Sequence, residues 1–254
     1  MTRLYDYWRS SASYRVRMAL HLLGEAFEIA PVDLLQAEQV GAENLARNPQ
    51  GLVPTLEIDG LSLTQSLAII EYLNDTRAAG FLPDDPAGRA RVRALSYAVA
   101  MEIHPVCNLR VGRFAESASG GAITMQAWQQ KFIAEGLAAL ETMLNHPATG
   151  QFCHGDRVTM ADLCLVPQVY NAQRWGVDVT SFSQISRIVA ELQDIPAIAA
   201  TTGSAFVGHD GLASMPLLKW LCKMNDTVFV ARHDRRSVAR QVEDVRTAVR
   251  DTGA

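Results

Sequence analysis

The pattern of apolar residues changes at one short segment, and this change limits the folds that the chain can adopt. Before residue 80, short strand-like runs alternate with helix-like runs, whereas only helical patterns follow from residue 88 to about residue 200. The segment between them, GFLPDDPAG at residues 80–88, contains two prolines and two glycines and is typical of a linker. The sequence therefore predicts a small α/β domain over residues 1–80 and an all-helical domain over residues 88–200.

Within the first 80 residues, the expected order is strand, helix, strand, short helix, hairpin, helix. Residues 3–8 are rich in aromatic side chains and predict a strand, and residues 12–23 carry apolar side chains at helical spacing. Gly24 is a plausible C-cap for that helix. Asp59-Gly60 lies between two strand-like runs, which predicts a tight hairpin. A further helix is expected from Ser66 through Leu73.

The second half contains long helical patterns over residues 88–118, 122–145 and 159–174, with a shorter one over 183–194. Thr159 and Asp162 have the spacing of a capping box, with Asp in place of the usual Glu. Residues 201–254 differ in character and are treated as a C-terminal extension of unknown role. A short strand is expected at residues 228–230. The arginine-rich last 23 residues fit either an amphipathic helix or a loosely attached end.

Composition excludes several classes of protein. Apolar residues make up 48% of the chain and charged residues 20%, so a sizeable core can form. The net charge of −4 gives no electrostatic footprint for nucleic acid. The four cysteines form no CxxC pair and no zinc spacing, so we expect no metal site. Because neither a signal peptide nor a long apolar run is present, we expect a reduced, cytoplasmic protein without a membrane partner.

Two serines are the first candidates for a functional site. The chain contains none of the common motifs for dinucleotides, P-loops, zinc proteases or hydrolase elbows. Ser10 and Ser11 instead lie where the first expected strand leads into the first expected helix. The free N–H groups and partial positive charge of a helix N-terminus favour a bound anion. The alternative is that both serines are simple N-caps, because Ser is favoured at that position.

Two further features point to the same kind of ligand. Val53 precedes Pro54 at the start of a strand, where a cis peptide bond would turn the Val53 backbone outward for pairing. Gln65 and Ser66 begin a helix directly after a strand, which makes a second N-terminus suited to an anion. Two helix starts and one exposed backbone edge predict a site for an extended peptide that carries a carboxylate and a thiol.

Four segments of the chain resemble one family closely. They are RSSASYRVR at residues 9–17, NPQGLVPT at 48–55, QSLAIIEYL at 65–73 and DRVTMADLCLVPQV at 156–169. Through these segments the chain is similar to the zeta-class glutathione transferases, over about residues 3–198. The resemblance implies a thioredoxin-like N-terminal domain, an all-helical C-terminal domain, a homodimer and glutathione as cofactor.

The resemblance also implies roles for individual residues. Ser10 and Ser11 would face the sulfur of glutathione and would be the catalytic residues. Val53 would pair with the cysteinyl backbone, and Gln65 with Ser66 would hold the γ-glutamyl end. Gln39, His104 and Asn108 match further positions that line the glutathione site, although a structural role for His104 is about equally compatible with its place before Pro105.

Three arginines match positions that bind the carboxylates of an acidic substrate in some family members. They are Arg9, Arg110 and Arg174. A planar guanidinium suits bidentate contacts to a carboxylate, so an acidic diketo acid is the expected small-molecule partner. The alternative is that these arginines are surface or ion-paired residues, which is the usual fate of an arginine.

The implied reaction is the glutathione-dependent cis–trans isomerisation of maleylacetoacetate to fumarylacetoacetate, in tyrosine and phenylalanine breakdown. Alternatives are the same reaction on maleylpyruvate, or transfer of glutathione to α-halo acids or peroxides. A non-catalytic glutathione-binding protein is a third possibility, against which the intact Ser10-Ser11 pair argues. The chain departs from the family pattern at Ala12, where many eukaryotic members carry Cys, and after about residue 200, where no match is found.

Overall fold

The chain consists of two compact units, Met1–Ile195 and Pro196–Ala254. The computed structural model describes residues 1–195, 197–198, 201, 208–209 and 229–230. All the candidate site residues lie in the first unit, so the architecture of that unit positions the site. The boundaries expected within it, at residues 80 and 88, stay a prediction.

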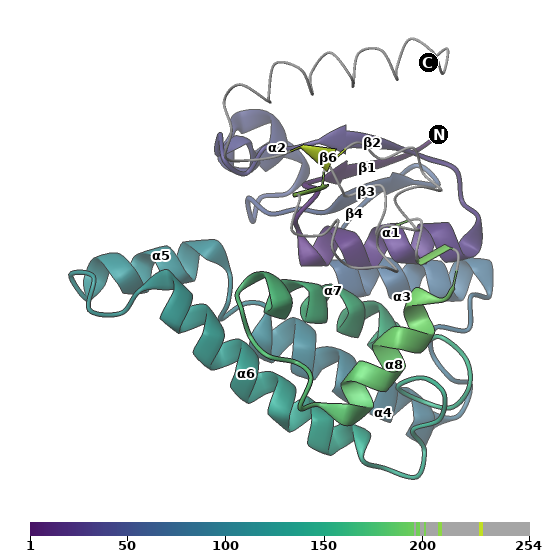
Figure 1. The fold of residues 1–254 in the computed structure, drawn as a ribbon. Coiled ribbons are helices and arrows are strands. Elements are labelled where there is room, and N and C mark those ends of the chain that lie inside the picture. The colour runs from purple at the N-terminus through teal and green to yellow at the C-terminus, as the bar shows by residue number, and fades with distance from the viewer. Residues whose placement is uncertain (196, 199–200, 202–207, 210–228, 231–254) are drawn as a thin grey trace. The chain divides into compact units, whose positions relative to one another are not determined.

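The first unit begins with a four-stranded mixed sheet (Figure 1). Its strands lie in the order β2-β1-β3-β4, with β1 parallel to β2 and antiparallel to β3, and β3 antiparallel to β4. The turn between the last two strands has positive φ at both Asp59 (54°) and Gly60 (78°), as a tight two-residue hairpin requires. The strands are β1 (Thr2–Asp6), β2 (Phe27–Pro31), β3 (Thr55–Ile58) and β4 (Leu61–Thr64).

Two long helices lie side by side beneath one face of this sheet, α1 (Ser11–Leu23) and α3 (Ser66–Arg77) (Figure 1). The short elements η1 (Glu38–Val40) and α2 (Ala42–Arg47) connect β2 to the hairpin. Gly24 ends α1 in the left-handed conformation, as expected of a C-cap glycine. Together these elements confirm the thioredoxin-like N-terminal fold.

The rest of the first unit is helical and packs on the side of α1 and α3 away from the sheet (Figure 1). Contacts between α1 and α7 join the two halves. Among residues 1–195, the part after residue 80 contains no strand. Its elements are α4 (Pro86–Tyr97), the π-helical turn η2 (Ala98–Ile103), α5 (Leu109–Ala118), α6 (Met125–Leu144), α7 (Met160–Arg174) and α8 (Ser183–Gln193).

The prediction of one continuous helical segment over residues 88–118 was wrong. The helix widens into η2 and then stops at a turn that contains Pro105, so α5 begins only at Leu109. Proline has no N–H to donate and its ring clashes with the preceding turn, which explains the break. The break matters for the site because it leaves His104 in the turn and Asn108 at the N-cap of α5, rather than both on one helix face.

The segment expected as a linker, residues 80–88, contains the start of α4 at Pro86 and has buried side chains. Asp85 caps α4 by accepting a hydrogen bond from the Gly88 N–H at 2.7 Å. Phe81 and Leu82 are buried, and the Phe81 carbonyl accepts a hydrogen bond from the Met160 N–H. The capping box of α7 is confirmed, since Asp162 accepts hydrogen bonds from both the N–H and the hydroxyl of Thr159 at 2.7 Å.

The second unit contains two short parallel strands among its described residues, β5 (Gly208–His209) and β6 (Phe229–Val230). The second of them falls at the strand expected from the sequence. The apolar run at residues 217–221 and the arginine-rich last 23 residues lie outside the described residues. In the part of the chain that the structure describes, no helix combines the length and the apolar character needed to cross a bilayer.

Candidate glutathione and substrate site

Ser10 and Ser11 lie at the N-terminus of α1, after the loop that connects β1 to this helix. Ser10 is the N-cap, and its Oγ accepts a hydrogen bond from the Ser13 N–H at 3.2 Å. Ser11 is the first helical residue and is buried, with 9% of its surface exposed. Because a hydroxyl that accepts one hydrogen bond still has its own proton to donate, the capping role of Ser10 leaves its O–H available for an anion.

The Val53-Pro54 peptide bond is cis, as the extended-peptide reading of the sequence requires. Val53 is half-buried and precedes β3 directly. Among the described residues, neither its N–H nor its carbonyl has a backbone partner. The Val53 backbone is therefore available to pair with an extended ligand.

Gln65 and Ser66 form the start of α3, and Gln65 has an unusual backbone. Its φ of 66° with ψ of 110° is a conformation that residues other than glycine rarely adopt. The Gln65 amide donates a hydrogen bond to Oε1 of Gln50 at 2.6 Å. Ser66 is the first residue of the helix and is buried. The first N–H groups of α3 and the Ser66 hydroxyl thus belong to the same helix start.

Arg15 contacts this second helix start and was not predicted from the sequence as a site residue. Its side chain is 2% exposed, and its Nη1 donates to Ser66 Oγ at 3.2 Å. Its Nη2 lies 3.4 Å from Nδ1 of His104. Arg15 therefore joins α1, the start of α3 and the turn after η2. The only sequence signal was an arginine at an otherwise inward-facing position of an amphipathic helix.

His104 is neutral in this site. Burial and the nearby Arg15 lower the pKa of His104 to about 3. Since arginine has donors and no acceptor, Nδ1 of His104 must accept the hydrogen bond from Arg15. The ring proton is then on Nε2.

Gln39 and Asn108 lie on separate segments. Gln39 belongs to η1 and is half-buried, and its carbonyl accepts a hydrogen bond from Asn44. The buried Oε1 of Gln39 has no partner among the described residues. Asn108 is the N-cap of α5, with its Oδ1 bound by the Arg110 N–H at 3.1 Å. The capping role therefore accounts for the side-chain oxygen Oδ1 of Asn108. The side-chain oxygen Oε1 of Gln39 is available to a ligand.

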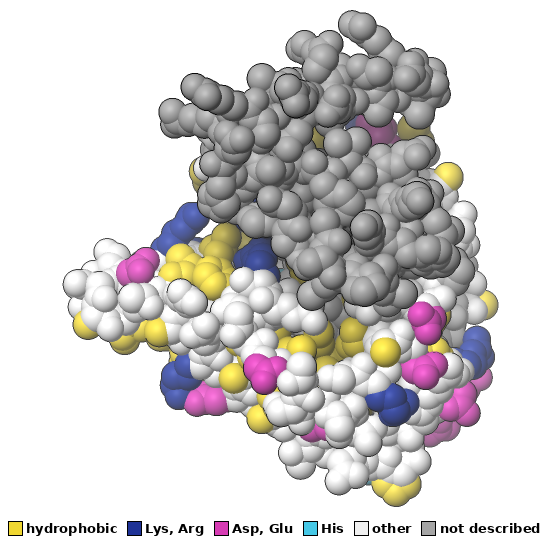
Figure 2. Space-filling model, viewed as in Figure 1, with side chains coloured by type: hydrophobic (Ala, Val, Ile, Leu, Met, Phe, Trp, Pro, Cys, Tyr) yellow, Lys and Arg dark blue, Asp and Glu magenta, His cyan; other side chains and the backbone are white. Residues whose placement is uncertain are grey.

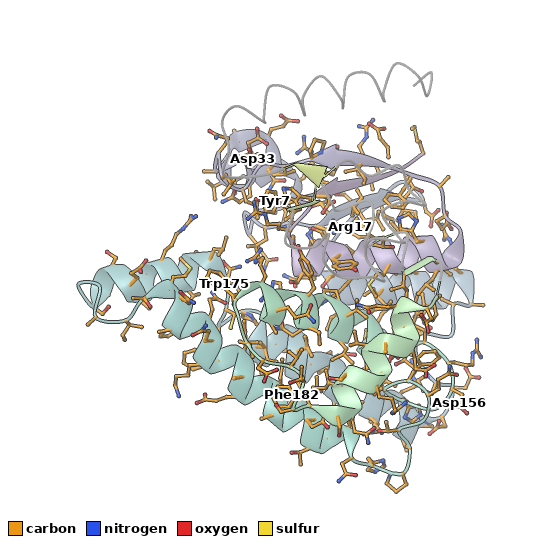
Figure 3. All side chains as sticks on the ribbon, in the orientation of Figure 1. Tyr7, Arg17, Asp33, Asp156, Trp175 and Phe182 are labelled. Atoms are coloured by element: carbon orange, nitrogen blue, oxygen red, sulfur yellow. The ribbon has the colours of Figure 1, made fainter. Side chains whose placement is uncertain are left out.

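The charges of Arg9 and Arg174 act on each other although the two residues come from opposite halves of the unit. The pKa of Arg174 is lowered by burial of its guanidinium and, further, by the positive charge of Arg9. Tyr170 and Tyr7 act on the same group in the opposite direction. Figure 3 shows Tyr7, which follows β1, on the same side of the unit as Trp175, which follows Arg174 at the end of α7. Two neighbouring cations repel, so this place favours an anionic ligand.

Both guanidiniums lie against aromatic rings. Cζ of Arg9 is 4.3 Å from the centre of the Trp8 ring, and Cζ of Arg174 is 5.4 Å from that of Trp175. The buried Nε of Arg9 has no hydrogen-bond partner within the described part of the chain. Neither arginine has an acidic partner there. The ion-paired alternative considered for Arg9 and Arg174 therefore finds no support, whereas Arg174 is exposed, as the surface alternative expects, and Arg9 is half-buried.

Arg110 is the sequence candidate that the structure does not bring to this pair. It is exposed in the first turn of α5, and no ion pair of its side chain is found among the described residues. On the face drawn in Figure 2, basic and hydrophobic side chains lie next to one another beside α5. Phe114, also on α5, is 74% exposed. Arg110 is thus on an open surface rather than in a built contact.

The three cysteines that the structure describes are unsuited to nucleophilic chemistry. Burial raises the pKa of Cys107 to about 11, and burial also raises the pKa values of Cys153 and Cys164. Because the thiolate is the reactive form, these three buried cysteines stay protonated and inert at neutral pH. Cys222 lies outside the described residues. None of the three described cysteines would therefore supply the thiolate for a reaction at Ser10 and Ser11.

Comparison with known proteins agrees with this geometry. Residues 1–75 match the family model described as Glutathione S-transferase, N-terminal domain. A maleylacetoacetate isomerase of Rhizobium meliloti (strain 1021) is 68% identical over 182 residues, which cover 71% of this chain and 85% of the relative. The class defined by the fold and the two helix starts is thus that of the glutathione S-transferases.

Two solved structures indicate which class of glutathione S-transferase the chain resembles. A maleylacetoacetate isomerase from Methylobacterium extorquens AM1 with bound malonate and glutathione is 40% identical with a TM-score of 0.75, over 78% of this chain and 95% of that chain. The holo structure of a zeta-class maleylpyruvate isomerase is 37% identical with a TM-score of 0.77, over 81% of this chain and 98% of that chain. The chain belongs to the zeta-class glutathione S-transferase family that contains the maleylacetoacetate isomerases.

Proposed function

We propose that this chain catalyses the glutathione-dependent cis–trans isomerisation of maleylacetoacetate to fumarylacetoacetate. The observation that carries the proposal is that Arg9, next to the N-cap of α1, and Arg174, at the end of α7, lack acidic partners among the described residues and act on each other electrostatically. A doubly acidic substrate would neutralise that pair. The 68% identity to a maleylacetoacetate isomerase supports the choice of substrate.

The residues present fit glutathione. The unpaired Val53 backbone suits the cysteinyl backbone of the tripeptide, and Gln65 with Ser66 suits its γ-glutamyl end. The free Oε1 of Gln39 is an acceptor for an ammonium or N–H group of the ligand. His104 and Asn108 would complete the walls of the site. When bound, glutathione supplies a thiolate that adds reversibly to the double bond, so that rotation becomes possible.

The hydroxyl of Ser10 is the principal group that would keep that sulfur ionised, and Ser11 is the second. A free thiol has a pKa of about 8.5, so lowering it by about two units requires roughly 2.7 kcal/mol of preference for the anion. A helix N-terminus supplies about 0.3–1 kcal/mol when exposed. A hydrogen bond to a charged group supplies about 1.5–3 kcal/mol. The Ser10 hydroxyl should therefore contribute more than the α1 dipole.

Arg9 and Arg174 would hold the carboxylates of the diketo acid, and Arg110 would give a weaker contact from α5. Their second effect is electrostatic. Negative charge moves from the attacking sulfur into the conjugated keto group during addition, and fixed cations nearby stabilise that charge. As the double bond re-forms in the trans geometry, the same charge returns to the departing sulfur, so the arginines neither gain nor lose a proton.

The cellular setting is also part of the proposal. We place the enzyme in the cytoplasm, in tyrosine and phenylalanine breakdown, as a homodimer without nucleic-acid or membrane partners. The exposed Tyr97 and Met101, at the junction of α4 and η2, support an interface between subunits. Sedimentation equilibrium of the purified chain would test the dimer, with a monomer mass at micromolar concentration counting against it.

The proposed function can be tested by comparing substrates under identical conditions. The purified protein and glutathione are mixed in turn with maleylacetoacetate, maleylpyruvate and an α-halo acid, and loss of substrate and of free thiol are both followed. The proposal expects the highest kcat/KM with maleylacetoacetate and no loss of thiol. A higher kcat/KM with maleylpyruvate would favour the alternative suggested by the similar zeta-class structure. Loss of thiol with the halo acid alone would indicate a general transferase.

A further inference from the structure

Arg15 is almost fully buried, and its hydrogen-bond partners carry no negative charge. Its side chain belongs to α1, and these partners are the neutral groups Ser66 Oγ and His104 Nδ1. Its buried Nε has no partner among the described residues. A buried charge without a counter-ion costs several kcal/mol, so a protein retains one where it has a use.

Arg17, two residues further along the same helix, shows the contrast. It is equally buried, and its Nη1 lies 2.7 and 2.6 Å from the two carboxylate oxygens of Asp6. Arg17 therefore has a complete counter-ion within the fold. Arg15 has none in the described part of the chain.

The contacts of Arg15 determine the hydrogen-bond roles of Ser66 and His104. Because arginine only donates, Ser66 Oγ and His104 Nδ1 must both act as acceptors toward it. The Ser66 proton is then left to donate elsewhere, and the His104 ring carries its proton on Nε2. Two groups that could act either way thus become donors, at a helix start that itself presents free N–H groups. Such a set of donors suits a carboxylate.

We propose that Arg15 is a positioning residue of the glutathione site, which holds Ser66 and His104 as donors and supplies the buried positive charge that the γ-glutamyl carboxylate neutralises. The inference rests on the proposed binding of glutathione at Gln65 and Ser66. It adds that the counter-ion of Arg15 is the ligand. Binding of the carboxylate and the charge of Arg15 are consequently coupled, through Ser66 rather than by direct contact.

The test is a thermodynamic cycle that combines removal of the Arg15 side chain with removal of the γ-glutamyl carboxylate from the ligand. Calorimetry gives the Kd of glutathione and of γ-aminobutyryl-cysteinylglycine, which lacks that carboxylate, for the parent protein and Arg15→Met. In the parent, removal of the carboxylate should weaken binding about 10- to 100-fold. In Arg15→Met that ratio of Kd values should fall by about 10-fold. The unliganded variant should melt no lower than the parent, because it has lost an uncompensated buried charge.

Arg91→Met is the matched control. Arg91 is also held by neutral oxygens, those of Met143, Thr149 and Cys153, but it lies within the helical part. Its loss should lower the melting temperature and leave the ratio of Kd values unchanged. The same pattern in Arg15→Met, a lower melting temperature with an unchanged ratio of Kd values, would show that Arg15 is structural and would overturn the proposal.

Two conservative variants keep the test decisive if Arg15→Met aggregates. Arg15→Lys keeps the charge and should keep most of the parental ratio of the two Kd values. Arg15→Gln keeps donors without the charge, and its ratio should fall as in Arg15→Met. An equal ratio in both would contradict the proposal, as would failure of every Arg15 variant to fold. If the parent protein itself binds no glutathione, the proposed function fails, and this outcome is distinct from a parent that binds glutathione without any dependence on Arg15.

Discussion

Arg17 and Asp6 form a buried ion pair that fixes the loop from which the site is built. Arg17 Nη1 contacts both carboxylate oxygens of Asp6, and Nη2 donates to the Trp8 carbonyl at 3.1 Å. Both side chains are almost fully buried, at 3% and 4% exposure (Figure 3 shows Arg17 on α1). The pair joins the end of β1 to α1, so the loop between them has little freedom to move Arg9 or Ser10.

Removal of one partner of this pair should destabilise the protein strongly. Asp6→Asn leaves Arg17 buried without a full counter-ion, and such changes cost about 3–5 kcal/mol. Urea denaturation followed by circular dichroism measures the free energy of unfolding. The double change Asp6→Asn with Arg17→Met should recover part of the loss, because it removes the unpaired charge. A single variant as stable as the parent would show that the pair is not a fixed element of the loop.

Ser10→Ala should raise the pKa of bound glutathione. The near-ultraviolet thiolate absorbance should fall at neutral pH, and activity should drop steeply and recover partly as pH rises. Ser11→Ala should show the same changes more weakly, and the Kd of glutathione should change little in both. Loss of the N-cap should also cost about 1 kcal/mol of stability. A bound thiol that titrates as in the parent would leave Ser10 as a helix cap alone.

Arg174→Ala should weaken the acidic substrate far more than glutathione. Loss of a charge-assisted carboxylate contact costs about 1.5–3 kcal/mol in the transition state, or roughly 10- to 150-fold in kcat/KM. Steady-state kinetics give this ratio, and calorimetry gives the Kd of glutathione, which should stay near the parental value. Arg110→Ala is the comparison, because Arg110 has no aromatic ring contact of the kind that Arg174 makes with Trp175, and we expect a smaller effect. Equal losses for substrate and glutathione would mean that Arg174 supports the glutathione site or the fold.

His104 predicts a pH dependence of stability. Its pKa is about 3 in the folded chain and about 6.5 when unfolded, so between these values the unfolded state binds the extra proton. The contribution of His104 to stability is therefore complete above about pH 6.5 and is lost as pH falls toward 3, at up to about 1.4 kcal/mol per pH unit. Urea titrations across this range of pH, with His104→Gln beside the parent, measure it. If the free energy of unfolding changes with pH equally in the two proteins, His104 is exposed to water rather than buried beside Arg15.

Much of the fold could be predicted because its signals are local. Asp59 and Gly60 supply the two positive φ angles of the hairpin, Gly24 supplies the left-handed C-cap, and Thr159 with Asp162 supplies the capping box. The break between α4 and α5 was missed because helical periodicity continues through η2, and the effect of Pro105 on the chain was given too little weight.

The site was harder to predict than the fold, because it depends on contacts between distant segments. The sequence shows helix starts at Ser10 and Ser66, but it does not show that Arg15 reaches Ser66 and His104. A buried arginine without a carboxylate looks, in a sequence, like any helical arginine. The effect of the Arg9 charge on Arg174 likewise exists only once α7 packs against α1.

The central claim is that glutathione takes part in the reaction and is returned unchanged. The most direct measurement is conversion of maleylacetoacetate by the purified protein with far less glutathione than substrate, followed by proton NMR of the product and by thiol titration at the end. The account predicts complete conversion to the trans, fumaryl product with all the thiol recovered. Conversion that stops when one equivalent of glutathione has been consumed would contradict it, as would isomerisation at the same rate without glutathione.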